Sequence, residues 1–110
     1  MANKYTRALL NVSNTLETSI YQQPLTVNSV VLFSLYITNT SASSIHIDLT
    51  LNNSTGDKIY LCKNLEIPNS EQLVFDKNIN FDNANANEIK IKLNDSATSA
   101  SVILSLIEVS

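Results

Sequence analysis

Two side chains that could support acid–base chemistry lie close together in an alternating segment of the sequence. From Ile45 to Leu51, apolar residues occupy every second position, and this period of two predicts a β-strand with one buried face. His46 and Asp48 share the other face, where they could orient one another beside a serine nucleophile, as a hydrolase triad requires. The same pattern predicts an ordinary solvent-facing strand surface, which we favour because the chain has a single histidine and scattered carboxylates.

The single cysteine is a second candidate for chemistry. Cys62 precedes Lys63, and a neighbouring cation can lower the pKa of a thiol. Adjacent residues of a strand point to opposite faces, however, so the pattern favours a small buried thiol. One cysteine and one histidine, His46, can form neither an internal disulfide nor a Cys/His zinc cluster. We therefore expect no catalytic residues, no metal and no cofactor.

The segment from Asp76 to Asn87 contains side chains that could bind a cation. Its oxygen-bearing residues alternate as they do at the start of a calcium-binding EF-hand loop: Asp76, Asn78, Asn80 and Asp82. Phe81 stands where that loop needs glycine and Asn87 stands where it needs a bidentate glutamate, so an EF-hand is excluded. An irregular surface calcium site in this segment stays open as an alternative.

The charge and hydropathy of the chain exclude some classes of partner. Seven Lys and Arg against ten Asp and Glu give a net charge of −3, and the basic residues are scattered over 110 residues. A nucleic-acid site needs a concentrated basic face, so we expect no nucleic-acid partner. We also expect no membrane partner, because no apolar run resembles a signal peptide or approaches the roughly 18 residues that span a bilayer. The expectation is a soluble protein, kept inside a cell unless a larger assembly carries it out.

The elements that must position these side chains are predicted to be β-strands. Strand-like alternation recurs in three later segments, Lys58 to Lys63, Glu71 to Asp76 and Glu88 to Asn94. The many β-branched residues favour strands, and the many Asn and Ser residues favour turns. Together with the remaining apolar runs, this pattern predicts one all-β domain over residues 1–110, a single antiparallel β-sandwich or jelly roll of about seven to eight strands.

Two segments are apolar on both faces and therefore predict an interaction surface. From Val30 to Asn39 and from Ser101 to Val109, both sets of alternate positions carry large apolar side chains. Either the sandwich itself covers both faces, or a neighbouring subunit covers the outer one, because exposed apolar patches usually mark contacts between proteins. For the second alternative, a homo-oligomer, we assign six residues to the interface: Val30, Leu32, Tyr36, Ile103, Ile107 and Val109.

The N-terminal segment fits two patterns. Leu10 and Val12 alternate as in a strand, whereas Leu9, Val12 and Leu16 follow the spacing of a helix face. The intervening Thr, Ser and Asn residues favour strand or extended chain over helix. We expect residues 1–14 to form an extended N-terminal arm that reaches a neighbouring protein.

The order of the segments carries a resemblance to a known group of proteins. Its elements are Ile20-Tyr21 before a turn, the run from Val30 to Asn39, Tyr60-Leu61-Cys62-Lys63-Asn64, Ile67-Pro68 leading to Leu73, and the closing run from Val102 to Val109 with Glu108 near its end. In this order the chain resembles the small β-sandwich virion proteins of tailed bacteriophages. It departs from that group where Asn69-Ser70 and residues 85–87 replace the usual turn glycines.

The resemblance implies a non-enzymatic structural protein of a virion, made in the host cytoplasm. The role that we favour is a capsid decoration or cement subunit that contacts itself and a capsid or tail protein of the same particle. A neck or tail component of the virion is the alternative within this class. A different class is a module that binds carbohydrate on a host surface through the segment from Asp76 to Asn87, with Phe75 and Phe81 as the nearby aromatic side chains.

Overall fold

The structure, a computed structural model, describes residues 3–24, 26–53, 57–76, 79–82 and 87–109, and for Phe81 and Asp82 it describes the backbone alone. Within these residues the chain forms nine β-strands: β1 (Asn3–Val12), β2 (Thr18–Gln22), β3 (Ser29–Asn39), β4 (Ile45–Asn52), β5 (Lys58–Ile67), β6 (Gln72–Phe75), β7 (Ile79–Asp82), β8 (Glu88–Leu93) and β9 (Ala100–Val109). No described segment forms a helix long and apolar enough to cross a membrane.

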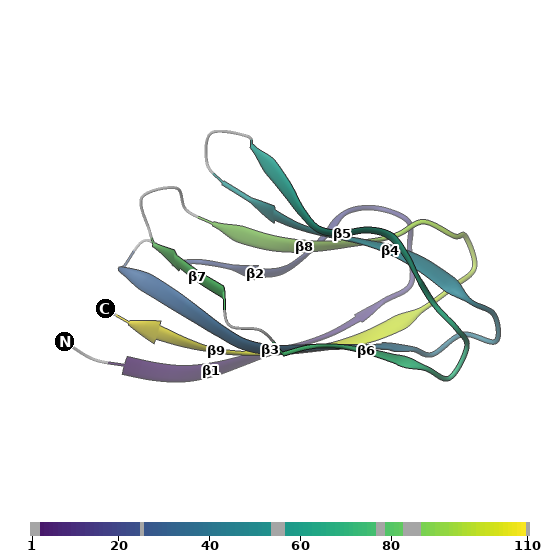
Figure 1. Cartoon of the computed structure of the whole chain (residues 1–110), viewed down its shortest axis with the longest axis horizontal. Coiled ribbons are helices and arrows are strands. Elements are labelled where there is room, and N and C mark those ends of the chain that lie inside the picture. Colours follow the sequence, from purple (N-terminus) through teal and green to yellow (C-terminus); the bar gives the residue numbers. More distant parts are fainter. Residues whose placement is uncertain (1–2, 25, 54–56, 77–78, 83–86, 110) are drawn as a thin grey trace.

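The strands form two antiparallel sheets that pack face to face (Figure 1). The five-stranded sheet has the order β1-β9-β3-β6, with β7 also paired to β3, and the four-stranded sheet has the order β2-β8-β4-β5. Because β6 and β7 pair with successive parts of β3 along one edge, they act as one interrupted strand. The result is two sheets of four strand positions each, which is the arrangement of a jelly roll. The predicted all-β sandwich is confirmed.

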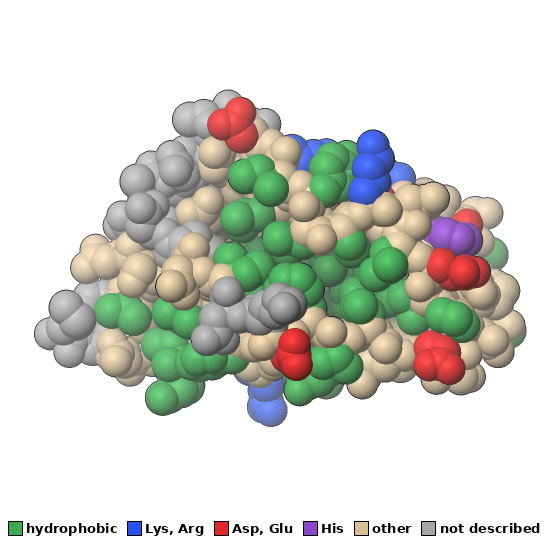
Figure 2. Space-filling view, viewed as in Figure 1, with side chains coloured by type: hydrophobic (Ala, Val, Ile, Leu, Met, Phe, Trp, Pro, Cys, Tyr) green, Lys and Arg blue, Asp and Glu red, His purple; other side chains and the backbone are tan. Residues whose placement is uncertain are grey.

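The core lies between the sheets and consists of aliphatic side chains at alternate strand positions. In β4, the buried residues are Ile45, Ile47 and Leu49, while His46 and Asp48 point outward as their alternation predicted. The same alternation buries Ile89, Ile91 and Leu93 of β8. From the five-stranded sheet the largest buried side chains are Leu32, Leu35, Ile37, Leu104 and Leu106. Figure 2 shows apolar side chains continuing through the middle of the molecule between the two layers.

A buried polar contact joins the two sheets near the end where the chain termini lie. The Tyr21 hydroxyl of β2 donates a 2.5 Å hydrogen bond to the Glu108 carboxylate of β9, and Glu108 is 9% exposed. Burial of the phenol raises the pKa of Tyr21 well above its usual value, and the hydrogen bond to Glu108 adds to this effect. Tyr21 therefore remains a neutral donor at physiological pH and satisfies a carboxylate that would otherwise be buried without a partner.

Most of the segment expected to be an extended N-terminal arm, residues 1–14, forms a strand of the sandwich. Residues Asn3–Val12 form β1, which pairs with β9 along its whole length, from Asn3 opposite Val109 to Val12 opposite Ala100. Pairing satisfies the backbone groups of the segment that face β9, and the side chain of Val12 enters the core. Of the two patterns in this segment the strand is correct, and β1 is an edge strand of the five-stranded sheet.

Candidate functional site

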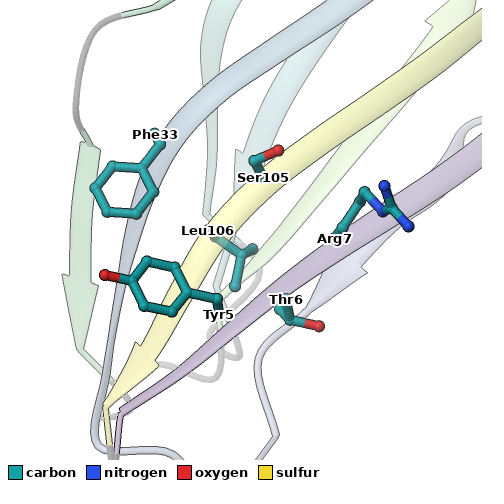
Figure 3. A pocket seen from close by; sticks show the side chains of 6 residues that line it. All are labelled: Tyr5, Thr6, Arg7, Phe33, Ser105 and Leu106. Atoms are coloured by element: carbon teal, nitrogen blue, oxygen red, sulfur yellow. The ribbon is translucent and has the colours of Figure 1, made fainter.

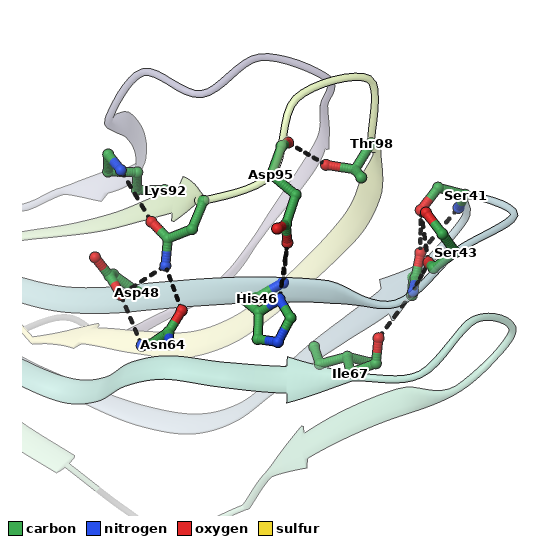
Figure 4. A network of polar contacts seen from close by, with 11 residues as sticks. Ser41, Ser43, His46, Asp48, Asn64, Ile67, Lys92, Asp95 and Thr98 are labelled. Atoms are coloured by element: carbon green, nitrogen blue, oxygen red, sulfur yellow. Dashed lines mark hydrogen bonds and ion pairs between the residues drawn. The ribbon is translucent and has the colours of Figure 1, made fainter.

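The histidine and the carboxylate that could serve a hydrolase triad share a sheet face but are hydrogen-bonded to different partners. His46 Nδ1 lies 3.0 Å from Asp95 Oδ2, and the same oxygen accepts a hydrogen bond from the His46 backbone N–H at 2.7 Å. Asp48 Oδ1 instead accepts from the Asn64 backbone at 2.8 Å and from the Asn94 side chain at 3.1 Å (Figure 4). His46 thus attaches the loop after β8 to β4, whereas Asp48 binds β5 and the residue that follows β8. No described serine hydroxyl hydrogen-bonds His46. The outer face of β4 is a solvent-facing polar surface.

Acid is expected to weaken these two attachments. Burial raises the pKa of Asp48, but its hydrogen bonds from Asn64 and Asn94 outweigh this and lower it overall. The hydrogen bonds from His46 lower the pKa of Asp95. The pKa of each carboxyl is lower in the folded protein than in the unfolded chain, so each stabilises the fold fully above its unfolded pKa and loses its contribution as the pH falls through the folded pKa. Urea midpoints at about pH 7 and about pH 3 measure this loss.

Amide variants of Asp48 and Asp95 separate the contribution of these two carboxyls to acid sensitivity from that of other groups. We expect the double variant Asp48→Asn with Asp95→Asn to lose less stability on acidification than the native protein, because the amides keep an acceptor oxygen and do not titrate. Glu66→Gln changes an exposed carboxyl on the same sheet and is the control. An unchanged acid response in the double variant would show that other groups dominate it.

The cysteine is a poor nucleophile in this environment. Cys62 is half-buried on β5, and burial raises the pKa of its thiol even though a hydrogen bond from the Leu49 backbone opposes the effect. The neighbouring Lys63 ammonium lies over the Tyr60 ring, 5.1 Å from its centroid. The thiol is therefore protonated at neutral pH, which does not favour nucleophilic chemistry.

The candidate calcium segment lies partly outside the described residues. Asn78 is outside them, as are the side chain of Asp82 and residues 83–86. In the part of the chain that the structure describes, no three His, Cys, Asp or Glu side chains gather into a potential metal site. The carbohydrate site proposed for the same segment used Phe75 and Phe81, and Phe75 is half-buried against the core instead of standing free.

The six predicted interface residues divide between the core and the surface. Val30 and Leu32 are both 0% exposed and lie in the core, so their assignment to an interface is wrong. The cause is a β-bulge in β3 between Leu32 and Ser34. Up to Leu32 the even-numbered residues face inward, whereas after the bulge the odd-numbered Leu35 and Ile37 do. A bulge adds one residue to a strand and so exchanges its two faces.

The other four interface residues lie on the outer face of the five-stranded sheet: Tyr36, Ile103, Ile107 and Val109. There the register joins them to apolar side chains that the sequence analysis missed. Leu9 of β1, Ile103 of β9, Tyr36 of β3 and Val74 of β6 form one row across four strands. A second row contains Tyr5, Ile107 and Val31. We call these seven residues, with Phe33 and Val109, the apolar outer face.

The exposed side chains of the apolar outer face are large. Tyr5 is 77% exposed and Leu9 is 64% exposed. The bulge directs Phe33 outward, where its ring stacks on that of Tyr5 with centroids 6.3 Å apart and an interplanar angle of 23°. Beside this pair a hollow of about 510 Å³ is lined by Tyr5, Thr6, Arg7, Phe33, Ser105 and Leu106 (Figure 3). Aromatic and arginine side chains around a depression are typical of the strongest contacts in protein interfaces.

The outer face of the four-stranded sheet has the opposite character. Glu17, which precedes β2, forms ion pairs with Lys58 and with Lys90. Lys90 lies 3.7 Å from Glu88, and Lys92 donates to Asn94 at 2.9 Å. In Figure 2 most of the visible Lys and Arg side chains lie along the upper edge, where this sheet is. The four-stranded sheet therefore carries paired charges, together with exposed Ile59, Tyr60 and Leu65 on its edge strand β5, whereas the five-stranded sheet has the apolar outer face.

Comparisons with known proteins identify the fold. No protein-family model matches the sequence, and no curated protein is significantly similar to it. A subunit of the Bacillus endospore appendages, described as a novel family of disulfide-linked pili, aligns over 98% of this chain and 88% of its own, with a TM-score of 0.63 and 7% identity. The VP2 subviral particle of infectious bursal disease virus aligns over 97% of this chain, with a TM-score of 0.57 and 10% identity.

The alignment with VP2 covers 32% of the viral chain, so this protein spans about a third of that chain's length. The SPBc2 prophage-derived protein YomS aligns over 100% of this chain and 96% of its own, with 13% identity and a TM-score of 0.43, too low to carry a structural argument. At such low identities, the pilus and capsid likenesses show a shared jelly-roll fold.

Proposed function

We propose that this protein is a non-enzymatic structural subunit of a bacteriophage virion, a capsid decoration or cement protein that acts by self-association and by contact with a major structural protein. The observation that carries the proposal is the apolar outer face of the five-stranded sheet. Monomeric soluble proteins rarely expose a contiguous apolar surface of this kind, and where they do, it usually contacts another protein. The paired charges of the opposite face leave that face suited to solvent.

Two further observations support a structural role. The jelly-roll fold is shared with a capsid subunit and with a pilus subunit, both of which are parts of repeating assemblies. The described residues that could have served catalysis are engaged otherwise, since His46 pairs with Asp95, Asp48 accepts a hydrogen bond from β5, and Cys62 is a protonated thiol. A neck or tail component of the virion would use the same surface, and the virion is the proposed location in either case.

A subunit of a surface fibre is the second candidate. It is favoured by the pilus comparison, which covers 88% of the other chain and so includes nearly the whole of both proteins. The two candidates differ in symmetry, because a closed contact between copies produces a finite oligomer, whereas a contact between two different patches propagates into a filament.

The first test is whether the apolar outer face mediates self-association. We expect light scattering to show an oligomer whose mass falls on dilution, and Tyr36→Lys to shift it to monomer by placing an ammonium in the contact. Tyr60→Lys is the matched control, since Tyr60 is 44% exposed on the four-stranded sheet, and it should leave the mass unchanged. A native protein that is monomeric at every concentration, or equal effects of the two variants, would contradict the proposal.

The second test locates the protein in its source cells. Antibody labelling in electron microscopy is expected to mark phage particles released from the cells. Label on surface fibres would favour the second candidate, and label confined to the cell interior after particle release would contradict both.

A further inference from the structure

One polar row crosses the apolar outer face between its two apolar rows. Arg7 of β1 lies opposite Ser105 of β9, and Ser105 lies opposite Ser34 of β3. The pairing of β3 with β6 ends at Leu35 opposite Phe75. From this register we infer that Asp76, the residue that follows β6, extends the row on the side of Ser34. The row therefore begins with a cation at the β1 edge, ends with an anion at the β6 edge, and has two small hydroxyl side chains between them.

The two charges at the ends of this row have no partner among the residues that the structure describes. Arg7 and Asp76 are both exposed, and neither forms an ion pair or hydrogen bond with any described side chain. Three strand spacings of about 4.8 Å separate them by roughly 14 Å, beyond the reach of a direct contact. This contrasts with the opposite sheet, where Glu17 pairs with two lysines.

We propose that two copies of this chain pack their apolar outer faces together around a twofold axis that runs parallel to the strands, between β9 and β3. This inference rests on the proposed function and specifies the arrangement of its self-association. The rotation carries the β1 edge of one copy over the β6 edge of the other. Arg7 of each copy then faces Asp76 of its partner, so the dimer contains two equivalent ion pairs, as an isologous contact requires.

The same rotation places the apolar row that runs from Leu9 to Val74 over the same row of the second copy. Leu9 of one copy faces Val74 of the other, and Ile103 faces Tyr36, so each end of the row meets its opposite end. Packed sheets lie about 10 Å apart, a separation that an arginine and an aspartate span together. A twofold axis along the row would instead place Arg7 over Arg7 and Asp76 over Asp76, and this repulsion selects against that arrangement.

The size of the face is consistent with a reversible dimer. Four strands spaced about 4.8 Å apart, with about ten residues rising 3.4 Å each, present a face of roughly 600 Å². Two such faces bury roughly 1,200 Å² in total, which is at the lower limit for specific stable interfaces. The ion pairs therefore determine the orientation of the copies more than the strength of their association.

A charge exchange tests this dimer. We expect Arg7→Glu and Asp76→Arg, measured separately by sedimentation equilibrium, each to raise the dissociation constant at least about tenfold, because each places two like-charge pairs in the interface. The double variant carrying both changes restores opposite charges and should return the dissociation constant to within about threefold of the native value. Lys63→Glu, an exposed change on the four-stranded sheet with the same effect on net charge as Arg7→Glu, is the control.

The outcomes separate this inference from the proposed function. Weakening by both single variants and recovery in the double variant support the dimer. An oligomer that neither single variant weakens, or that the double variant fails to restore, overturns the dimer and leaves self-association in place. A native protein that never associates overturns both. Circular dichroism confirms that each variant is folded, which is expected because both side chains are exposed.

Discussion

Leu32→Ala is expected to lower the free energy of unfolding by about 3 kcal/mol, a large fraction of the roughly 5–15 kcal/mol that stabilises a domain of this size. Leu32 is 0% exposed and lies in register with Leu106 and Ile79 on the inner face of the five-stranded sheet. Truncation to alanine removes apolar contacts and leaves a cavity that the two sheets cannot close without moving. Urea unfolding followed by far-UV circular dichroism, at a concentration where the protein is monomeric, measures the loss.

The matched variant for this experiment is Ile103→Ala on the apolar outer face. Ile103 is 42% exposed, so we expect its truncation to cost less than about 1 kcal/mol of stability but to weaken self-association. The pair of variants therefore distinguishes core from interface. A Leu32→Ala protein that remains stable but no longer self-associates would restore Leu32 to the interface and contradict the position of the bulge in β3.

Asn39→Ala is expected to cost about 2–3 kcal/mol, although it removes few apolar contacts. Asn39 is 2% exposed at the end of β3. Its amide donates to the Ser43 carbonyl at 2.8 Å and to the Ile67 carbonyl at 2.9 Å, and its oxygen accepts from the Ser41 backbone at 2.9 Å. This one side chain connects the β3–β4 turn to the end of β5 in the other sheet (Figure 4). Its loss removes the side-chain donor of the buried Ile67 carbonyl and two of the bonds that hold the turn.

Two further variants test whether the hydrogen bonds of Asn39 cause this loss of stability. Asn39→Asp has nearly the same shape but replaces the donating amide with a second acceptor that faces two carbonyls, so we expect it to be as damaging as alanine at neutral pH. Asn11→Ala is the control, because Asn11 is an exposed strand-end asparagine with a single side-chain hydrogen bond from Ser101. Thermal unfolding compares the three. An Asn39→Asp protein as stable as the native one would show that the two donated bonds contribute little.

Much of the fold is predictable from the sequence, because strand alternation is a local property. The period of two in Ile45 to Leu51 identifies β4 and its buried face, and the two-faced runs identify β3 and β9 as strands with apolar side chains on both sides. The same alternation placed His46 on a solvent-facing surface. These predictions succeed because the direction of a side chain along an unbroken strand depends on its neighbours in sequence.

Which residues form the apolar outer face depends on the pairing of strands, and no single segment of the sequence determines that pairing. Alternation assigned Val30 and Leu32 to an outer face, and the bulge beside Phe33 reversed that assignment. An extra residue in a strand is detectable in the hydrogen-bond register with its neighbour, and that register forms between segments far apart in the chain. Leu9 and Val74 were missed for the same reason, since each looks like an isolated apolar residue until β9 and β3 bring them into one row.

The sequence alone therefore established the all-β class, most of the strands and the presence of surplus apolar surface, because these follow from composition and from the period of side chains along each strand. Tertiary structure decided which residues form that surface and how its charges are arranged. Arg7 and Asp76 are 69 positions apart in the chain and acquire a common row through the pairing of intervening strands. Such long-range register is set by packing of the whole sandwich, and a local pattern cannot contain it.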